Sequence, residues 1–254
     1  MTDRWGFYFA NVDGKPASFN INLGLIDTAP DTGRPWKGEF SVRMAETTEH
    51  GFPTAAEYER LNGLEDTLLA KLHDGAEAMF VGQITSAGIR TLVFYAPDGD
   101  RLRSALDEAS QAYPDFEILP SRVDLDAEWS YYLKTLYPGQ EDLQSIENRD
   151  ASANLKRYGD DLSQPRPVTH WAYFDLQLNR EAFVAEMEAQ GFAHETTEDP
   201  ESARPYGVRL ERIDHVDFRS IDRVTHPIVR SAHAHHGEYD GWECPVIAAE
   251  PVLV

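Results

Sequence analysis

The chain has one cysteine, Cys244, in 254 residues. A single thiol cannot form an intramolecular disulfide or a cysteine-rich zinc site, which excludes small domains that are stabilised by disulfides or by zinc. No apolar run approaches the roughly 18 residues that a membrane helix needs. The first residues, Met1 to Trp5, lack the basic start and the apolar stretch of a signal peptide. We therefore expect a cytoplasmic protein of bacterial type that has no membrane partner.

Basic residues are scarce as well. The chain holds 23 Lys and Arg against 44 Asp and Glu, which gives a formal net charge of −21. Such a surface repels phosphate backbones, so we expect no direct binding of nucleic acid, whereas basic protein segments would be attracted. Solubility alone explains the charge equally well, because net charge identifies neither a fold nor a partner.

The motifs that mark common catalytic sites are missing. The chain has no Gly-x-Ser-x-Gly, no phosphate-binding Walker loop, no Gly-x-Gly-x-x-Gly dinucleotide turn and no His-Glu-x-x-His. Its carboxylates are too numerous for one pair to stand out as acid and base. We therefore expect no catalytic residue, no cofactor, no metal and no enzymatic activity.

The first half of the chain alternates strand-like and helix-like patterns. Asp13-Gly14 lies between two runs of period two, which is typical of a hairpin. Thr54 and Glu57 form a capping box before a helix that we expect to stop at Gly75. The patterns predict strands at 5–11, 17–26, 36–45, 77–86, 89–96, 116–123 and 128–137, and helices at 54–75 and 100–113.

A polar helical pattern over 140–162 separates the two halves. The segment Ser163 to Pro167 follows it, and its two prolines stiffen the chain and keep it out of a helix. We therefore expect an N-terminal domain at 1–138, a connecting helix and linker at 139–167, and a C-terminal domain at 168–254.

The C-terminal domain has the order strand, helix, strand, strand, helix, strand. This βαββαβ order is the ferredoxin-like plan, an antiparallel sheet with both helices on one face. The fold class that we expect is α+β, with two domains of antiparallel sheets that carry their helices on one face. The patterns predict strands at 170–174, 192–197, 206–213 and 239–246, and helices at 180–190 and 218–236.

The densest group of unusual residues lies near the C-terminus. Gly237 follows a helical pattern, and we expect it to end the helix in a left-handed conformation. A period of two then places Asp240 and Trp242 on one face of a strand and Tyr239 on the other. We expect Trp242 in the core, Tyr239 on the surface as a recognition anchor, and a bulge or close backbone approach at Gly241.

Histidines at the end of the second helix allow another interpretation. His226, His233 and His236 share one helix face and could hold zinc or nickel together with a carboxylate. Ligands seven residues apart lie about 10 Å apart along a helix axis, so a solvated polar face fits better. His235 lies on the opposite stripe, where its charged form suits the helix C-terminus. Cys244 fits a small buried residue better than a nucleophile, because no base has a fixed place near it.

The heptapeptide Gly237-Glu238-Tyr239-Asp240-Gly241-Trp242-Glu243 resembles the closing signature of the bacterial regulators of ribonuclease E activity, type B. The resemblance covers roughly 168–248 and implies the same ferredoxin-like plan. It also implies inhibition of the nuclease by binding, without chemistry. Residues 1 to about 140 resemble a separate bacterial family of unknown function that often precedes such a domain.

The leading hypothesis is a non-enzymatic acidic regulator whose partner is a ribonuclease E-type nuclease. Its surface candidates are Glu238, Tyr239 and Glu243. The alternative is a small-molecule enzyme or binding protein with a site in a cleft between the domains and a metal on the histidine face. A partner-binding role of the N-terminal domain is a third hypothesis.

Overall fold

The structure is a computed structural model that describes residues 3–248. The chain forms two compact units, Met1–Pro138 and Gly139–Val254. The segment 139–167, expected as a connector, lies in the second unit, because its helix packs against another helix there. Residues 1–2 of the expected first domain and 249–254 of the expected last domain lie outside the described part.

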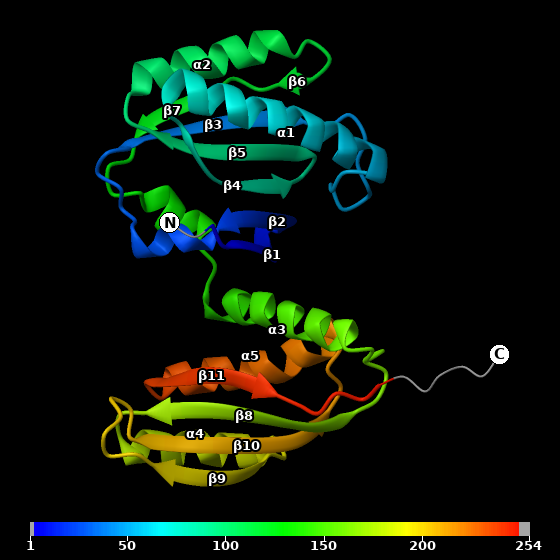
Figure 1. The fold of residues 1–254 in the computed structure, drawn as a ribbon, viewed down its shortest axis with the longest axis vertical. Coiled ribbons are helices and arrows are strands. Elements are labelled where there is room, and N and C mark those ends of the chain that lie inside the picture. The colour runs from blue at the N-terminus through cyan, green and yellow to red at the C-terminus, as the bar shows by residue number, and fades with distance from the viewer. Residues whose placement is uncertain (1–2, 249–254) are drawn as a thin grey trace, which may run out of the picture. The chain divides into compact units, whose positions relative to one another are not determined.

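The first unit is built on a sheet of seven strands with the order β1-β2-β4-β5-β3-β6, in which β7 also pairs with β3 (Figure 1). The hairpin at Asp13-Gly14 is confirmed, with φ of 51° and 78° at these two residues, as a type I′ turn requires. The strands are β1 (Trp5–Val12), β2 (Lys15–Asn22), β3 (Trp36–Arg43), β4 (Met79–Ser86), β5 (Ile89–Ala96), β6 (Glu117–Ile118) and β7 (Arg122–Leu125).

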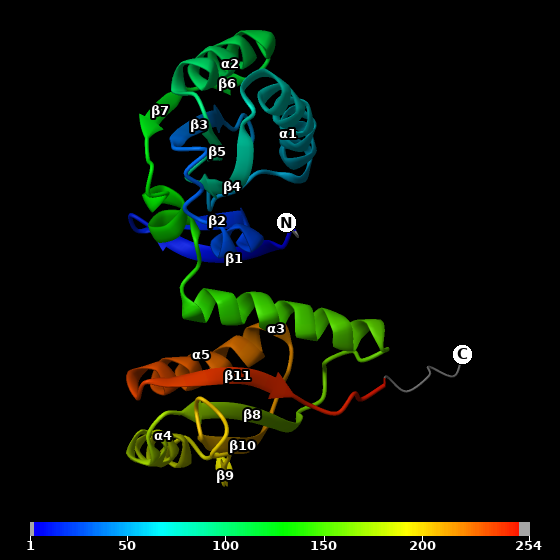
Figure 2. The same ribbon diagram turned by 60° about the vertical axis from the view of Figure 1, so that its left-hand side comes forward.

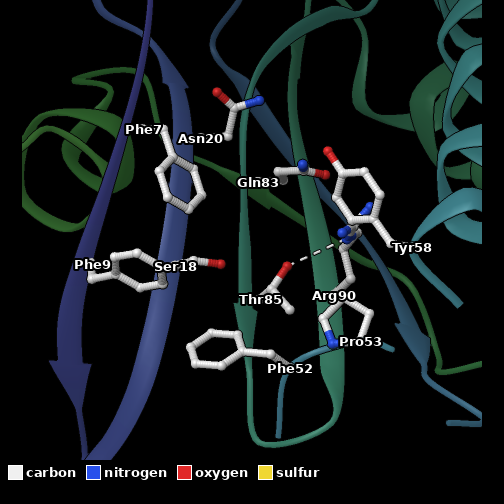
Figure 3. A pocket seen from close by; sticks show the side chains of 10 residues that line it. All are labelled: Phe7, Phe9, Ser18, Asn20, Phe52, Pro53, Tyr58, Gln83, Thr85 and Arg90. Carbon is white, nitrogen blue, oxygen red and sulfur yellow. Dashed lines mark hydrogen bonds between the residues drawn. The ribbon is translucent and has the colours of Figure 1, made fainter. Parts of the chain in front are cut away.

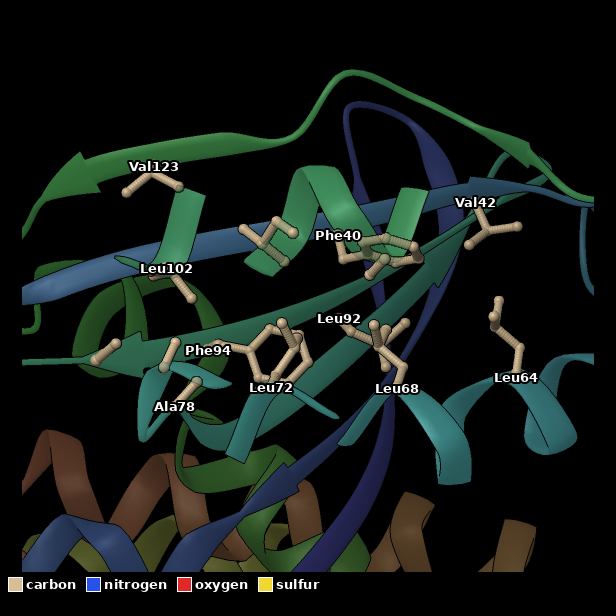
Figure 4. Close-up of a cluster of buried hydrophobic side chains, with 14 of the residues drawn as sticks. Phe40, Val42, Leu64, Leu68, Leu72, Ala78, Leu92, Phe94, Leu102 and Val123 are labelled. Carbon is tan, nitrogen blue, oxygen red and sulfur yellow. The ribbon is translucent and has the colours of Figure 1, made fainter. Parts of the chain in front are cut away.

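Helices α1 (Ala55–Ala76) and α2 (Gly99–Ala112) cover one face of this sheet. Figure 4 shows the resulting core, in which leucines of both helices meet alternate residues of β3 and β5; it includes Phe40, Val42, Leu64, Leu68, Leu72, Leu92, Phe94 and Leu102. The Thr54 hydroxyl accepts a hydrogen bond from the Glu57 amide and caps α1. The expected stop at Gly75 was wrong, because Glu77 takes the left-handed conformation with φ of 52° and ends the helix.

The aromatic segment 128–137 was expected to be a strand and is helical instead, with a helical turn at Tyr132–Leu136. The Asp126 carboxylate accepts hydrogen bonds from the amides of Ser130 and Tyr131 and so begins the turn. Trp129, Tyr132 and Leu136 follow helical spacing, and all three are buried on the sheet face opposite α1. The prediction of a strand was wrong because it relied on the many aromatic residues of this segment, although its buried residues have helical spacing. A second short helical segment, Leu23–Asp27, ends the expected strand 17–26 early.

The second unit has a four-stranded antiparallel sheet with the order β11-β8-β10-β9. In chain order this is 4-1-3-2, the ferredoxin-like arrangement, so the expected fold class is confirmed. Figures 1 and 2 both show α3 beside α5. The elements are α3 (Gln140–Arg157), β8 (Arg166–Phe174), α4 (Gln177–Ala189), β9 (Ala193–Glu198), β10 (Tyr206–Asp214), α5 (Phe218–Ala234) and β11 (Gly237–Glu243).

Candidate protein-binding face of the second sheet

Strand β11 is an edge strand with a bulge in its middle. Its pairing with β8 runs from Gly237 to Tyr239 and resumes one residue later, with Gly241 opposite Trp171. Gly241 adopts φ of 108°, a conformation that an L side chain rarely takes. The extra residue is Asp240, and it reverses the alternation of side chains after it. Tyr239 and Trp242 therefore lie on the same face, although period two had placed them on opposite faces.

The Tyr239 side chain packs against the core of the second unit. Its hydroxyl lies 2.7 Å from His170 Nδ1, in a hydrogen bond between β11 and β8. His170 is fully buried, and burial lowers its pKa to about 3, so the ring is neutral at neutral pH. Burial also raises the pKa of Tyr239 well above its usual value. The expectation of an exposed recognition anchor at Tyr239 was therefore wrong, because the bulge after Tyr239 lets this residue and Trp242 share the core face.

Trp242 packs against the core, as expected, and also ties β11 to α3. Its indole N–H donates to Asn148 Oδ1 at 2.7 Å. Asn148 is fully buried and donates in turn to Asp222 Oδ1 and Thr225 Oγ1 of α5 at 2.8 and 2.7 Å. Since every one of these buried groups has a partner, the network fixes the relative positions of α3, α5 and β11.

Gly237 does not end helix α5 in a left-handed conformation, as had been expected. The left-handed residue after α5 is His236, with φ of 56°, and Gly237 is the first residue of β11. A Cβ atom at Gly237 would overlap the ring of Phe174. Glycine is needed here because β11 passes close to a buried aromatic side chain, and the expected helix-ending conformation falls one residue earlier.

The open face of this sheet carries aromatic and acidic side chains. Figure 1 shows α4 and α5 on the far side of the sheet from the viewer. Trp171 and Tyr173 of β8 are half-buried on the near face, and their partners across β11 put Glu238 on the same face. Tyr173, Glu238 and Asp240 line a hollow of about 330 Å³ there, together with Arg204.

The carboxylates of β11 differ in how they are paired. Arg204 Nε donates to Glu238 Oε2 at 3.1 Å, so this charge is already balanced within the unit. Asp240 and Glu243 are exposed and form no hydrogen bond or ion pair through their side chains with any residue in 3–248. Glu243 lies opposite Thr169, on the same face as Glu238. Two of the three carboxylates are thus available to a cationic partner.

The histidines at the end of α5 are spread over separate partners. His226 Nε2 lies 2.8 Å from Ser145 Oγ, His233 Nδ1 lies 3.2 Å from Gln140 Nε2, and His235 Nε2 lies 3.0 Å from Glu186 Oε1. The helix ends at Ala234, so His236 no longer follows the helix face on which it was expected. Within the described residues no three His, Cys, Asp or Glu side chains converge on a point that could hold a metal ion.

Cys244 packs against the core of the second unit and is half-buried. Burial raises the pKa of its thiol and keeps the thiolate scarce at neutral pH. A nucleophilic cysteine needs the opposite shift. Its position therefore fits the structural role that the sequence favoured.

Comparison with known families places both units. The profile of the Family of unknown function (DUF695) matches residues 3–137, which is more than half of the chain. The chain belongs to this family. A second profile, Regulator of ribonuclease activity B, matches residues 145–244 of this DUF695 protein. Both matches confirm the resemblances seen in the sequence.

Other comparisons add little. A search of curated proteins gives no match to this DUF695 protein. A crystal structure of an unknown protein from Galdieria sulphuraria is 13% identical and covers 84% of this chain and 99% of its own, with a TM-score of 0.23. In the part of the chain that the structure describes, every helix is too short or too polar to cross a membrane.

Sequence reasoning missed the aromatic pair at the centre of the open face. The signal was present, because Thr169, Trp171 and Tyr173 alternate with the buried His170 and Ala172. Reasoning also missed the ion pair between Asp160 and Arg166, whose side chains are 0% and 1% exposed. Asp160 precedes the segment interpreted as a linker and Arg166 lies within it, and spacing alone does not reveal a buried pair.

Proposed function

We propose that this DUF695 protein is a non-enzymatic regulator that acts in the bacterial cytoplasm and lowers the activity of a ribonuclease E-type nuclease by binding it. The match of residues 145–244 to the Regulator of ribonuclease activity B family carries this proposal. The proposed contact is the open face of the second sheet, with Asp240, Glu243 and Glu238 around Trp171 and Tyr173.

The chemistry of this face suits an arginine-rich segment of the nuclease. A guanidinium can lie over a Trp or Tyr ring and pair with a carboxylate at the same time. The net charge of −21 adds a long-range attraction that raises the association rate and is screened by salt. The partner is therefore expected to dissociate more readily as ionic strength increases.

An RNA-cleavage assay with purified nuclease and the full chain tests the proposal. The informative variant is Asp240→Lys/Glu243→Lys, because neither carboxylate has an internal partner to lose. Each reversal changes a contact of about 1 kcal/mol at 4 Å in water from attractive to repulsive, so the inhibitory concentration should rise at least tenfold.

The control is Glu181→Lys/Glu188→Lys, which makes the same change in net charge on α4, on the other side of the sheet, and loses only surface contacts to Gln177 and His194. This control should inhibit nearly as well as the unmodified chain. Equal loss of inhibition in both double variants would show that net charge alone matters and that β11 is not the contact. Absence of any inhibition by the unmodified chain would refute the regulatory role itself.

A further inference from the structure

The first unit has a cleft on the part of its sheet that α1 and α2 leave uncovered. It has a volume of about 600 Å³ and is entirely within this unit. Figure 3 shows Phe7 and Phe9 of β1 on one side and Tyr58 on the other, with polar side chains of the sheet between them, and the Phe52 ring packs edge-on against the Phe9 ring at 5.8 Å. Phe7 and Phe9 are exposed, with 39% and 53% of their surface accessible to solvent.

The floor of the cleft consists of two rows across the sheet. Strand register places Phe7 beside Asn20 and Asn20 beside Gln83. The next row runs from Phe9 through Ser18 and Thr85 to Arg90. Each row thus begins at an aromatic ring and continues into polar side chains, all of which except Arg90 can both donate and accept hydrogen bonds.

Three polar side chains of this floor form no hydrogen bond with the described residues. Gln83 Oε1 is buried and has no hydrogen-bond partner among the described residues. The side chains of Ser18 and Asn20 likewise make no hydrogen bond within 3–248. A buried amide oxygen without a partner is unfavourable for folding, and such groups are tolerated where a ligand supplies the missing contact.

Arg90 holds the inner end of the cleft in a fixed geometry. It is 3% exposed, and its Nε donates to Thr85 Oγ1 at 3.3 Å and its Nη1 to Asn62 Oδ1 at 3.2 Å. Glu65 Oε2 lies 3.7 Å from Nη1, and the guanidinium also faces the Tyr58 ring at 5.3 Å. Its charge is therefore balanced within the unit, and the cleft has no free cation to hold a phosphate or a carboxylate.

We propose that this cleft binds a small, uncharged planar molecule whose edge carries amide-like donors and acceptors, of the nucleobase or nucleoside class. Aromatic walls stack on a flat ring, while Asn and Gln amides pair with ring edges of this kind. The acidic surface disfavours a polynucleotide, because each phosphate would be repelled. This site is separate from the open face of the second sheet and goes beyond the proposed regulation of a nuclease.

Titration calorimetry of the full chain with adenosine, guanosine, cytidine and uridine tests the proposal. At least one nucleoside should bind saturably with a dissociation constant of about 1 mM or lower. Its 5′-monophosphate and a short single-stranded RNA should bind more weakly than the nucleoside. Tighter binding of either would overturn the inference of an uncharged ligand, and so would the failure of all four nucleosides to bind.

The variant Gln83→Met tests whether the nucleoside binds in this cleft. It should weaken nucleoside binding at least tenfold while the unfolding temperature stays the same or rises, because the buried oxygen without a partner is removed. The matched control is Gln111→Met, an exposed residue of α2 that should leave both measurements unchanged. Asn20→Leu serves as a second variant and should also weaken binding. Unchanged affinity in Gln83→Met, or in Asn20→Leu if Gln83→Met does not fold, would overturn the assignment of the site.

Discussion

The buried ion pair of the second unit gives a sharp test of what holds this domain together. Arg166 Nη2 donates to Asp160 Oδ1 at 3.0 Å, and Nη1 donates to Asp160 Oδ2. Asp160 also accepts the amides of Leu162 and Ile247 at 2.8 and 2.9 Å, so it joins the end of α3 to the segment after β11. Asp160→Asn removes the charge and keeps the size of the side chain.

Removal of one partner of a buried pair costs about 3–5 kcal/mol, because the other charge stays buried. Arg166 would keep the carbonyls of Gln164 and Pro245 and one amide oxygen of the new side chain as acceptors, but its charge would face no anion. The hydrogen bonds from Arg166 lower the pKa of Asp160 from 3.8 to about 2. A lowered carboxyl pKa stabilises the folded state above the unfolded pKa by about 2.4 kcal/mol, which the unmodified chain should lose progressively as the pH falls from about 5 to about 1.

Hydrogen exchange measured by mass spectrometry reports the change in stability of the second unit as a change in amide protection. The first unit is the internal reference. Asp160→Asn should reduce the protection of β8 and β11 at pH 7, and the difference from the unmodified chain should shrink near pH 2. The matched control is Asp161→Asn, whose exposed carboxylate bonds only to Ser163 and should leave protection nearly unchanged. Equal protection in the two variants would refute the reasoning.

Three further substitutions test local features. Tyr239→Phe should destabilise the second unit by about 1–3 kcal/mol, because His170 Nδ1 loses its partner, and should leave nuclease affinity unchanged; a loss of affinity without a loss of stability would restore Tyr239 as a contact. Glu77→Gly should raise the unfolding free energy of the first unit by about 1 kcal/mol, since glycine adopts φ of 52° without strain, and lower stability in urea unfolding would contradict this. Gly237→Ala should lower the thermal stability of the second unit through overlap with Phe174, and an unchanged melting temperature would mean that β11 can shift away.

Local patterns predicted most elements of this fold. Asp13-Gly14 marked its hairpin because a two-residue turn with positive φ depends on those residues alone. The order of elements in the second unit was enough for the ferredoxin-like plan, since each strand and helix has its own period. The segment 128–137 failed because its helix depends on a cap at Asp126 and on packing against distant strands.

The sites were harder to predict because they depend on register. One bulged residue, Asp240, placed Trp242 on the face of Tyr239, because a bulge reverses every later position on a strand. The cleft of the first unit brings together Phe7, Asn20 and Gln83, which meet only when three strands pair in register. The spacing of these residues along the chain therefore does not predict that they lie side by side.

We propose that the second unit binds a basic segment of a ribonuclease through its open face. A pull-down of the arginine-rich segment of a ribonuclease E-type nuclease with the full chain, at low and at moderate salt, tests it most directly. We expect capture at low salt, weaker capture at moderate salt, and little capture by Asp240→Lys/Glu243→Lys at either salt concentration. Failure of the unmodified chain to capture the segment even at low salt would contradict the claim.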